Sequence, residues 1–156
     1  NKGINWKRLI LALVVSLGAG VISWLLTGNS MEMYKNLHKP ILSPPGQLFP
    51  VVWTVLYIFM GLASFLVYTS DKYTKPALTL YCTQLFLNFM WSIIFFNFRL
   101  YGISFILIII LLIFIIITVI KFFKTDKIAG ILMIPYILWT VFATYLTFYI
   151  WMFNEM

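Results

Sequence analysis

Charged residues are scarce in this chain: of its 156 residues, 10% are charged and 63% are hydrophobic. Soluble globular domains carry about 25% charged and roughly 45–50% apolar residues. A soluble domain of this length buries only about 70% of the surface of its unfolded chain, so large apolar patches would stay in water and cause aggregation. The composition therefore excludes a soluble enzyme and a disordered tail. It also excludes a nucleic-acid-binding domain, despite a net charge of +7.

Cysteine and histidine each occur once, as Cys82 and His38. A single cysteine excludes a disulfide framework and a metal site built on cysteines. One histidine, with no carboxylate in the apolar segments, leaves a conventional hydrolase without its general acid and base. His38 is either a solvated loop residue or a single haem or metal ligand. We expect no metal site and no cofactor.

The eleven basic and four acidic residues divide the chain into five uncharged segments. Each segment is long enough for one membrane helix of about 20 apolar residues, and none comfortably holds two. A membrane β-barrel would alternate apolar and polar residues, but the run Ile106–Ile117 shows no alternation. We expect an all-α bundle of five transmembrane helices in a single domain, 1–156, with antiparallel packing after the short second, third and fourth connections. The expected spans are 7–27, 49–69, 77–98, 101–122 and 129–152.

The first connection, 28–48, is long and contains Pro40, Pro44, Pro45 and Gly46, which favour a rigid turn over a helix. Lys and Arg are concentrated at the amino terminus and in the second and fourth connections. The positive-inside rule then places the amino terminus in the cytoplasm and the first loop outside. A signal peptide over the first twenty residues is the alternative interpretation of the amino terminus.

No Asp, Glu, Lys or Arg lies inside an expected span. Proton-coupled transporters and pumps usually carry an ionisable residue near the middle of the bilayer. This absence disfavours a small multidrug antiporter.

In the third span, Gln84, Asn88, Trp91 and Phe95 follow one another at intervals of four, three and four residues, and Ser92 lies beside them. This spacing places them on one face of a helix. An unpaired amide in hydrocarbon is costly, so the stripe should face the bundle interior. There it either bonds to other helices or lines a cavity.

The second span repeats this pattern with Trp53, Tyr57, Met60 and Ser64. Three helices therefore present aromatic faces, because the fifth span carries a similar face. The fifth-span face consists of Trp139, Phe142, Ala143 and Leu146.

Pro135 should kink the fifth helix just before Trp139, and a kink can open a pocket. Three other tryptophans near the ends of spans, Trp6, Trp24 and Trp151, are interpreted as interfacial anchors. In the first span, small residues recur every fourth position at Ala12, Ser16 and Gly20. This small stripe serves close packing within the bundle or a subunit interface.

Three stretches, Lys39–Gly61, Gln84–Phe96 and Pro135–Leu146, resemble the TspO/MBR family, and the similarity extends over nearly the whole chain. The resemblance implies a five-helix bundle, a homodimer, and a pocket under the first loop. It also implies binding of porphyrins such as protoporphyrin IX and of ligands of the benzodiazepine-receptor type. The ligand-binding residues implied in this way are Trp53, Tyr57, Gln84, Asn88, Trp91, Phe95, Trp139, Phe142, Ala143 and Leu146. The lid residues are Lys39, Pro40, Pro44 and Pro45.

The chain departs from the family pattern in several places. Met33 and Leu42 make the lid less aromatic, and Thr147 replaces an asparagine. No basic residue follows Tyr145 or Tyr149, so the cholesterol-recognition pattern is absent from the last helix.

Three functional hypotheses follow. The first is a membrane protein that binds porphyrins or other planar apolar ligands, with their propionates near Lys35 or Lys39. The second is light-dependent breakdown of the bound porphyrin, with Trp53 and Trp139 as photochemical partners. The third is a passive carrier of lipids, sterols or metabolites, or a scaffold. The expected partners are the lipid bilayer of a bacterial cell and a second copy of the chain, with no nucleic acid.

Overall fold

The computed structural model describes residues 5–27 and 48–154, and every regular element within these ranges is a helix. The helices are α1 (Trp6–Thr27), α3 (Leu48–Tyr68), α4 (Lys75–Ser92), the π-helical η2 (Ile93–Asn97), α5 (Tyr101–Thr125), α6 (Lys127–Leu132) and α7 (Ile134–Asn154). η2 continues α4, and α6 leads into α7. Among the described residues, five spans are long and apolar enough to cross a membrane. The chain is therefore an integral membrane bundle of five helices, which confirms the expected fold class.

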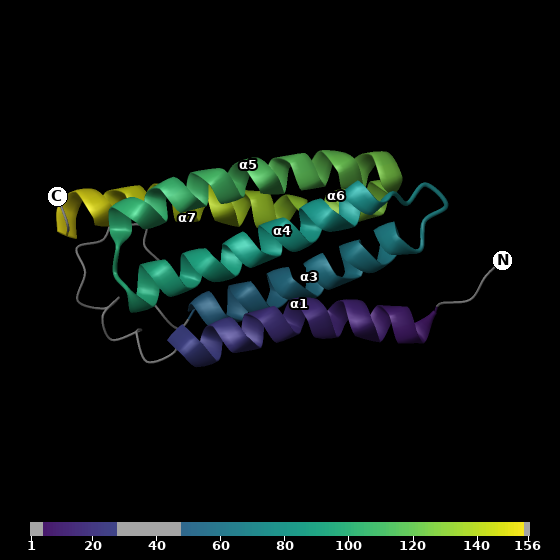
Figure 1. Ribbon diagram of the computed structural model, residues 1–156, viewed down its shortest axis with the longest axis horizontal. Helices are drawn as coiled ribbons and strands as arrows, with labels where there is room; N and C mark the ends of the chain where they lie inside the picture. Colours follow the sequence, from purple (N-terminus) through teal and green to yellow (C-terminus); the bar gives the residue numbers. More distant parts are fainter. Residues whose placement is uncertain (1–4, 28–47, 155–156) are drawn as a thin grey trace.

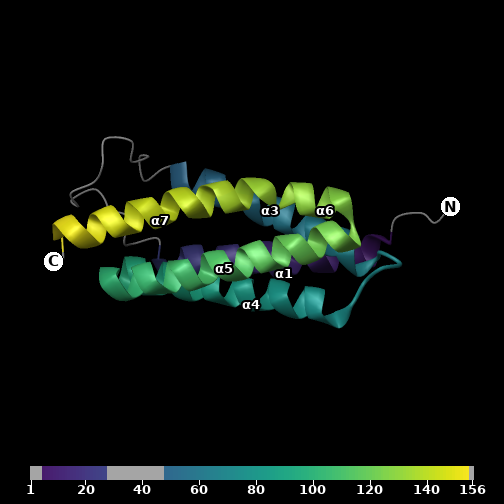
Figure 2. The same cartoon turned by 90° about the horizontal axis from the view of Figure 1, so that it is seen from above.

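The five spans lie side by side as long antiparallel rods (Figures 1 and 2). Along the ring, α1 packs on α3, α3 on α6, α5 on both α6 and α7, and α4 on α5. Contacts of α1 with α4 and η2 close the ring. The short second connection makes α3 and α4 antiparallel, but α3 packs more extensively on α1 than on α4.

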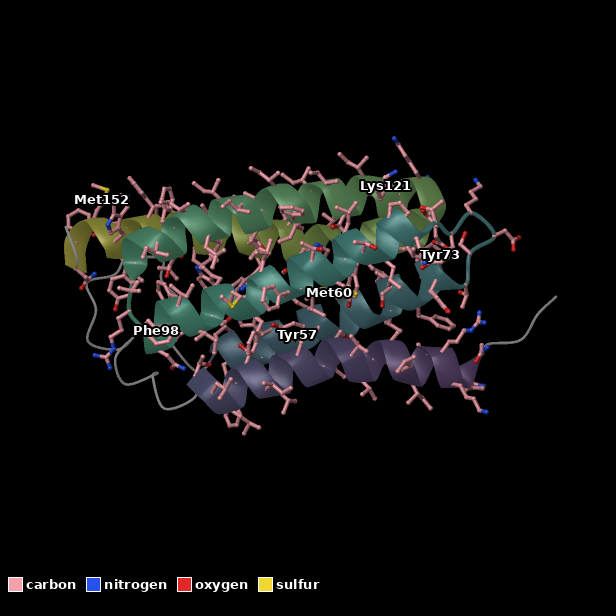
Figure 3. All side chains as sticks on the ribbon, viewed as in Figure 1. Tyr57, Met60, Tyr73, Phe98, Lys121 and Met152 are labelled. Atoms are coloured by element: carbon pink, nitrogen blue, oxygen red, sulfur yellow. The ribbon has the colours of Figure 1, made fainter. Side chains whose placement is uncertain are left out.

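The two ends of the bundle differ in charge. Tyr73 and Lys121 lie at one end, and Phe98 and Met152 lie at the other (Figure 3). The basic residues at the first end are Lys7, Arg8, Lys72, Lys75, Lys121, Lys124 and Lys127. Within the described ranges, the opposite end carries only Arg99. We call these the basic end and the loop end; α1 ends and α3 begins at the loop end (Figure 1).

The sides of the bundle follow the helical repeat. On α5, Ile108, Ile115 and Phe122 are fully buried, whereas Ile106 and Ile113 are exposed. In a membrane bundle, the exposed apolar face contacts lipid and the buried face packs on neighbouring helices. The long apolar run therefore has two distinct faces despite its uniform composition.

The last span is interrupted where Pro135 predicts a kink. α6 ends at Leu132, the Met133 amide donates to the Gly130 carbonyl oxygen at 3.2 Å, and α7 begins at Ile134. Proline lacks an amide hydrogen and clashes with the carbonyl four residues earlier. Tertiary contacts of α6 with α3 then hold the short segment in place.

The small stripe of α1 packs inside the bundle. Ser16 Oγ donates a hydrogen bond to the Tyr57 carbonyl oxygen at 2.7 Å. A Cβ atom at Gly20 would lie 2.5 Å from the Tyr57 ring, and one at Gly61 would lie 2.7 Å from Ser16 Oγ. Small residues on both helices therefore let the α1 and α3 backbones approach closely, which is the first of the two uses expected for the stripe.

Candidate functional site

A hydrogen-bonded network joins α3, α4 and α7 in the bundle interior. The Tyr57 hydroxyl donates to Asn88 Oδ1 at 3.0 Å, and Asn88 Nδ2 donates to the Tyr136 hydroxyl at 2.7 Å. The Tyr136 hydroxyl in turn donates to Gln84 Oε1 at 2.7 Å. All four side chains are buried. The two amides of the third-span stripe are thus bonded to other helices.

The sulfur of Met60 sets the direction of this network. Gln84 Nε2 lies 3.9 Å from Met60 Sδ, and a thioether sulfur only accepts hydrogen bonds. The Gln84 oxygen therefore faces Tyr136, which must donate to it. Asn88 must then donate to Tyr136 and accept from Tyr57. Tyr57 and Met60, both on α3, lie near the middle of the bundle (Figure 3).

Trp53 lies one turn closer to the loop end and contacts three other aromatic rings. Its ring centroid is 5.7 Å from Tyr57 and 6.3 Å from Tyr136. It is also 6.3 Å from Trp139, with the two indoles perpendicular. Trp139 contacts Phe142 at 5.6 Å. The structure therefore brings the aromatic faces of α3 and α7 together, in the edge-to-face geometry that aromatic pairs prefer.

Trp91 and Phe95 form a separate aromatic stack on α4 and η2, with centroids 5.2 Å apart. Both rings are buried, and Phe95 also meets Tyr101 at 5.3 Å. The Trp91 indole nitrogen has no hydrogen-bond partner within residues 5–27 and 48–154. These two predicted site residues pack between α4 and α5.

A cavity of about 330 Å³ lies between α1, α3 and the end of α4. Its size is near the lower end of small-molecule pockets, roughly 300–1,000 Å³. Its lining residues are Leu17, Gly20, Val21, Ser23, Trp24, Thr27, Pro50, Trp53, Thr54, Tyr57, Ser92 and Phe96. We call this the α1 cavity. It contains two of the ten predicted ligand-binding residues, Trp53 and Tyr57.

The other eight predicted residues lie outside this lining. Gln84 and Asn88 belong to the hydrogen-bonded network, and Trp91 and Phe95 to the aromatic stack. On α7, Trp139 contacts Trp53, Phe142 packs on Trp139, and Ala143 and Leu146 are buried. The predicted lid residues Lys39, Pro40, Pro44 and Pro45 lie outside the described residues, as do Met33, Lys35, His38 and Leu42.

The hydroxyl groups of the α1 cavity are largely satisfied by their own helices. Thr27 Oγ1 donates to the Ser23 carbonyl oxygen at 2.8 Å, and Thr54 Oγ1 to the Pro50 carbonyl oxygen at 2.6 Å. Ser92 Oγ donates to the Asn88 carbonyl oxygen at 3.3 Å. None of the described lining residues carries a charge. With four aromatic rings in its walls, the cavity suits a neutral, flat, apolar group.

Sequence reasoning missed the contribution of α1. Trp24 was interpreted as an interfacial anchor, but it lines the cavity while 54% exposed. A signal was present, because Ser16, Gly20, Ser23 and Thr27 repeat the four, three, four spacing of the other striped helices. Phe96 was also missed. It belongs to η2, whose π-helical turn holds more residues than an α-helical turn and changes which side chains face α1.

The sequence profile of the TspO/MBR family matches residues 10–152. The chain is 33% identical to a tryptophan-rich sensory protein of Cereibacter sphaeroides, over 93% of this chain and 90% of that protein. It is 38% identical to a tryptophan-rich protein TspO of Chlorobaculum tepidum, over 99% of each. It is also 33% identical to the translocator protein of Homo sapiens, over 92% of this chain and 87% of that protein.

Proposed function

The chain belongs to the TspO/MBR family, and from that premise we propose that it binds porphyrins, protoporphyrin IX among them, with the macrocycle packed against Trp53. The proposal also covers flat ligands of the benzodiazepine-receptor type. The observation that carries it is the α1 cavity, whose described walls hold Trp24, Trp53, Tyr57 and Phe96 without a charge. Mostly apolar walls with a few fixed polar groups are typical of such sites.

The network below the cavity supports a rigid site. Asn88 holds the Tyr57 hydroxyl, and Ser16 holds the Tyr57 backbone. The Tyr57 ring is therefore fixed from α1 and α4 before a ligand arrives. A preorganised wall reduces the ordering cost of binding.

Trp53 separates the α1 cavity from Trp139 and Phe142. A macrocycle against Trp53 reaches these α7 rings if the Trp53 indole turns. The porphyrin carboxylates stay at the loop end, because burying an unpaired charge among uncharged walls is costly. The proposal places this end outside a bacterial cell and the protein in a homodimer. The charge asymmetry of the bundle supports the orientation.

The test is a titration of the protein with protoporphyrin IX, in which porphyrin absorbance reports binding. Trp53→Phe should weaken binding about tenfold at most, because a favourable aromatic contact contributes roughly 0.5–1.5 kcal/mol. Trp151→Phe is the matched control, since Trp151 is also half-buried but packs on Phe105 and Phe148 instead. Unchanged affinity in the Trp53→Phe, Trp139→Phe double variant would remove the site. The carrier or scaffold hypothesis would then be preferred.

The Trp53–Trp139 contact favours one further activity, light-dependent breakdown of the bound porphyrin. An excited porphyrin takes one electron from the Trp53 indole, which leaves a porphyrin radical anion and an indole radical cation. Trp139, 6.3 Å away between centroids, then shares the oxidised state. Dioxygen takes the electron from the porphyrin radical anion and becomes superoxide, and the indole radical cation takes one electron back from the porphyrin. The resulting porphyrin radical cation combines with superoxide, so that one dioxygen is added to the ring and the indoles are restored. Illumination with dioxygen as the terminal oxidant should bleach the porphyrin faster in the wild type than in Trp139→Phe. Equal bleaching rates would leave binding alone.

A further inference from the structure

The α1 cavity extends from the lipid-facing surface into the bundle interior. At its outer side, Val21 and Trp24 are each 54% exposed. At its inner side, Tyr57 and Phe96 are each only 5% exposed. Exposed residues of a membrane-spanning bundle contact lipid. The cavity therefore has its mouth at the bilayer.

Among the described residues, the hydrogen bonds around the cavity join α1 to its neighbouring helices at two places but not between α1 and α3 near the loop end. Toward the bilayer centre, Ser16 Oγ bonds the Tyr57 carbonyl oxygen and joins α1 to α3. Beside η2, Asn97 Nδ2 donates to the Leu26 carbonyl oxygen at 2.7 Å and joins η2 to the last turn of α1. Within the described part of the two helices, no hydrogen bond joins α1 to α3 on the loop side of Tyr57. Between the described residues of α1 and α3, side-chain packing holds that side together.

The mouth lies within one leaflet. The lining residues of α1 run from Leu17 to Thr27, a rise of about 15 Å at 1.5 Å per residue. That is half of a hydrocarbon core of about 30 Å. The loop end of this stretch lies at the lipid headgroups, where the carboxylates of an amphiphile reside.

The polar side chains near the mouth do not obstruct the entry of an apolar ligand. Thr27 and Thr54 already donate to carbonyl oxygens of their own helices, so no hydrogen bond must be broken to admit an apolar ring. Val21 and Trp24 line the mouth from α1 and lie about one helical turn apart. Indole offers a flat surface along which a planar ring can slide.

We propose that the ligand reaches Trp53 sideways from the loop-end leaflet, between α1 and α3, past Val21 and Trp24. This inference depends on the proposed porphyrin binding. The ligand class is a flat amphiphile that first dissolves in the membrane and keeps its carboxylates at the headgroups. Binding then depends on the ligand concentration in the bilayer rather than in water.

The test uses stopped-flow binding of protoporphyrin IX to the full chain in phosphatidylcholine vesicles. Val21→Trp narrows the mouth. The matched control Ile22→Trp introduces the same side chain at a neighbouring position of nearly the same exposure, 53%, outside the cavity. In Val21→Trp, the association rate should fall about tenfold, and the dissociation rate should fall as well, because the ligand enters and leaves by the same path. Ile22→Trp should bind at wild-type rates.

A second variant tests the same path in the opposite direction. Trp24→Ala should raise the association rate, and it should raise the dissociation rate still more because Trp24 also lines the site; Leu25→Ala, at an exposed position outside the lining, should change neither rate. Wild-type rates in both Val21→Trp and Trp24→Ala would overturn the lateral entrance while leaving porphyrin binding intact. A change in affinity that comes from the dissociation rate alone, with a wild-type association rate, would also overturn it. Absence of binding in the wild type would instead contradict the proposed function.

Discussion

The Tyr57 hydroxyl donates to Asn88 Oδ1 at 3.0 Å, across the interior between α3 and α4. This bond links the aromatic wall of the α1 cavity to a polar network that reaches α7 through Tyr136. The same few side chains therefore stabilise the bundle and hold the wall of the proposed binding site in place.

The first prediction concerns the network. Tyr136→Phe removes one hydroxyl that accepts from Asn88 and donates to Gln84. Hydrogen bonds within membranes contribute about 0.6 kcal/mol on average, up to about 1.7, and two are lost here. The free energy of unfolding should fall by roughly 1–3 kcal/mol. Unfolding in detergent measures it, with Tyr145→Phe, an exposed tyrosine of the same helix, as the control. Equal stability of the two variants contradicts a structural role for the network.

The second prediction concerns the close approach of α1 and α3. A Cβ atom at Gly20 would lie 2.5 Å from Tyr57 Cδ2, whereas one at Gly18 would meet nothing within 4 Å. Gly20→Ala should lower the free energy of unfolding by about 1–3 kcal/mol, because overpacking forces side chains to shift. Gly18→Ala should be neutral or stabilising by up to about 1 kcal/mol. Thermal unfolding of both variants decides, and an equal effect at the two positions would rule out the close contact.

The third prediction concerns the start of the last span. Asp126 accepts hydrogen bonds from the Ile128 and Ala129 amides at 2.9 and 3.1 Å. Loss of such a cap costs about 0.5–2 kcal/mol, so Asp126→Ala should lower stability by this amount and Asp126→Asn by less. Asp71→Ala, at an exposed position in the connection after α3, is the control. If Asp126→Ala and Asp71→Ala unfold at the same midpoint, the Asp126 cap does not stabilise the bundle.

The fourth prediction concerns the volume of the α1 cavity. Ser92 lines the cavity from α4, and leucine at this position would occupy part of the 330 Å³. Ser92→Leu should weaken protoporphyrin IX binding by about tenfold or more, since a ligand contact replaced by a steric clash costs over 1 kcal/mol. Thr79→Leu, on the exposed side of α4, should bind like the wild type. Binding titrations of the two variants compare them directly, and full affinity in Ser92→Leu would place the ligand elsewhere.

Much of the fold follows from where charges are absent. The five uncharged segments predict the five spans, and Pro135 predicts the interruption at Met133. The spacing of Gln84 and Asn88 predicts an interior face, because amides are not stable against lipid. Each of these features depends on whether a residue is stable in lipid or in a continuous helix, and not on a partner helix. They can therefore be predicted from the sequence alone.

Features that depend on a partner helix are harder to predict. Trp24 is exposed to lipid and also lines a cavity, and an anchor and a cavity wall share the same sequence signature. Whether Gln84 and Asn88 bond to helices or face a hollow depends on Tyr57 and Tyr136, on two other helices. The π-helical turn that orients Phe96 has no marker in the sequence.

A structure of the protein in complex with protoporphyrin IX tests the central claim most directly. The account predicts the macrocycle in contact with the Trp53 indole, on the side that Tyr57 and Phe96 enclose, with its carboxylates at the loop end. A macrocycle bound without contact to Trp53, or at the basic end of the bundle, would contradict the account.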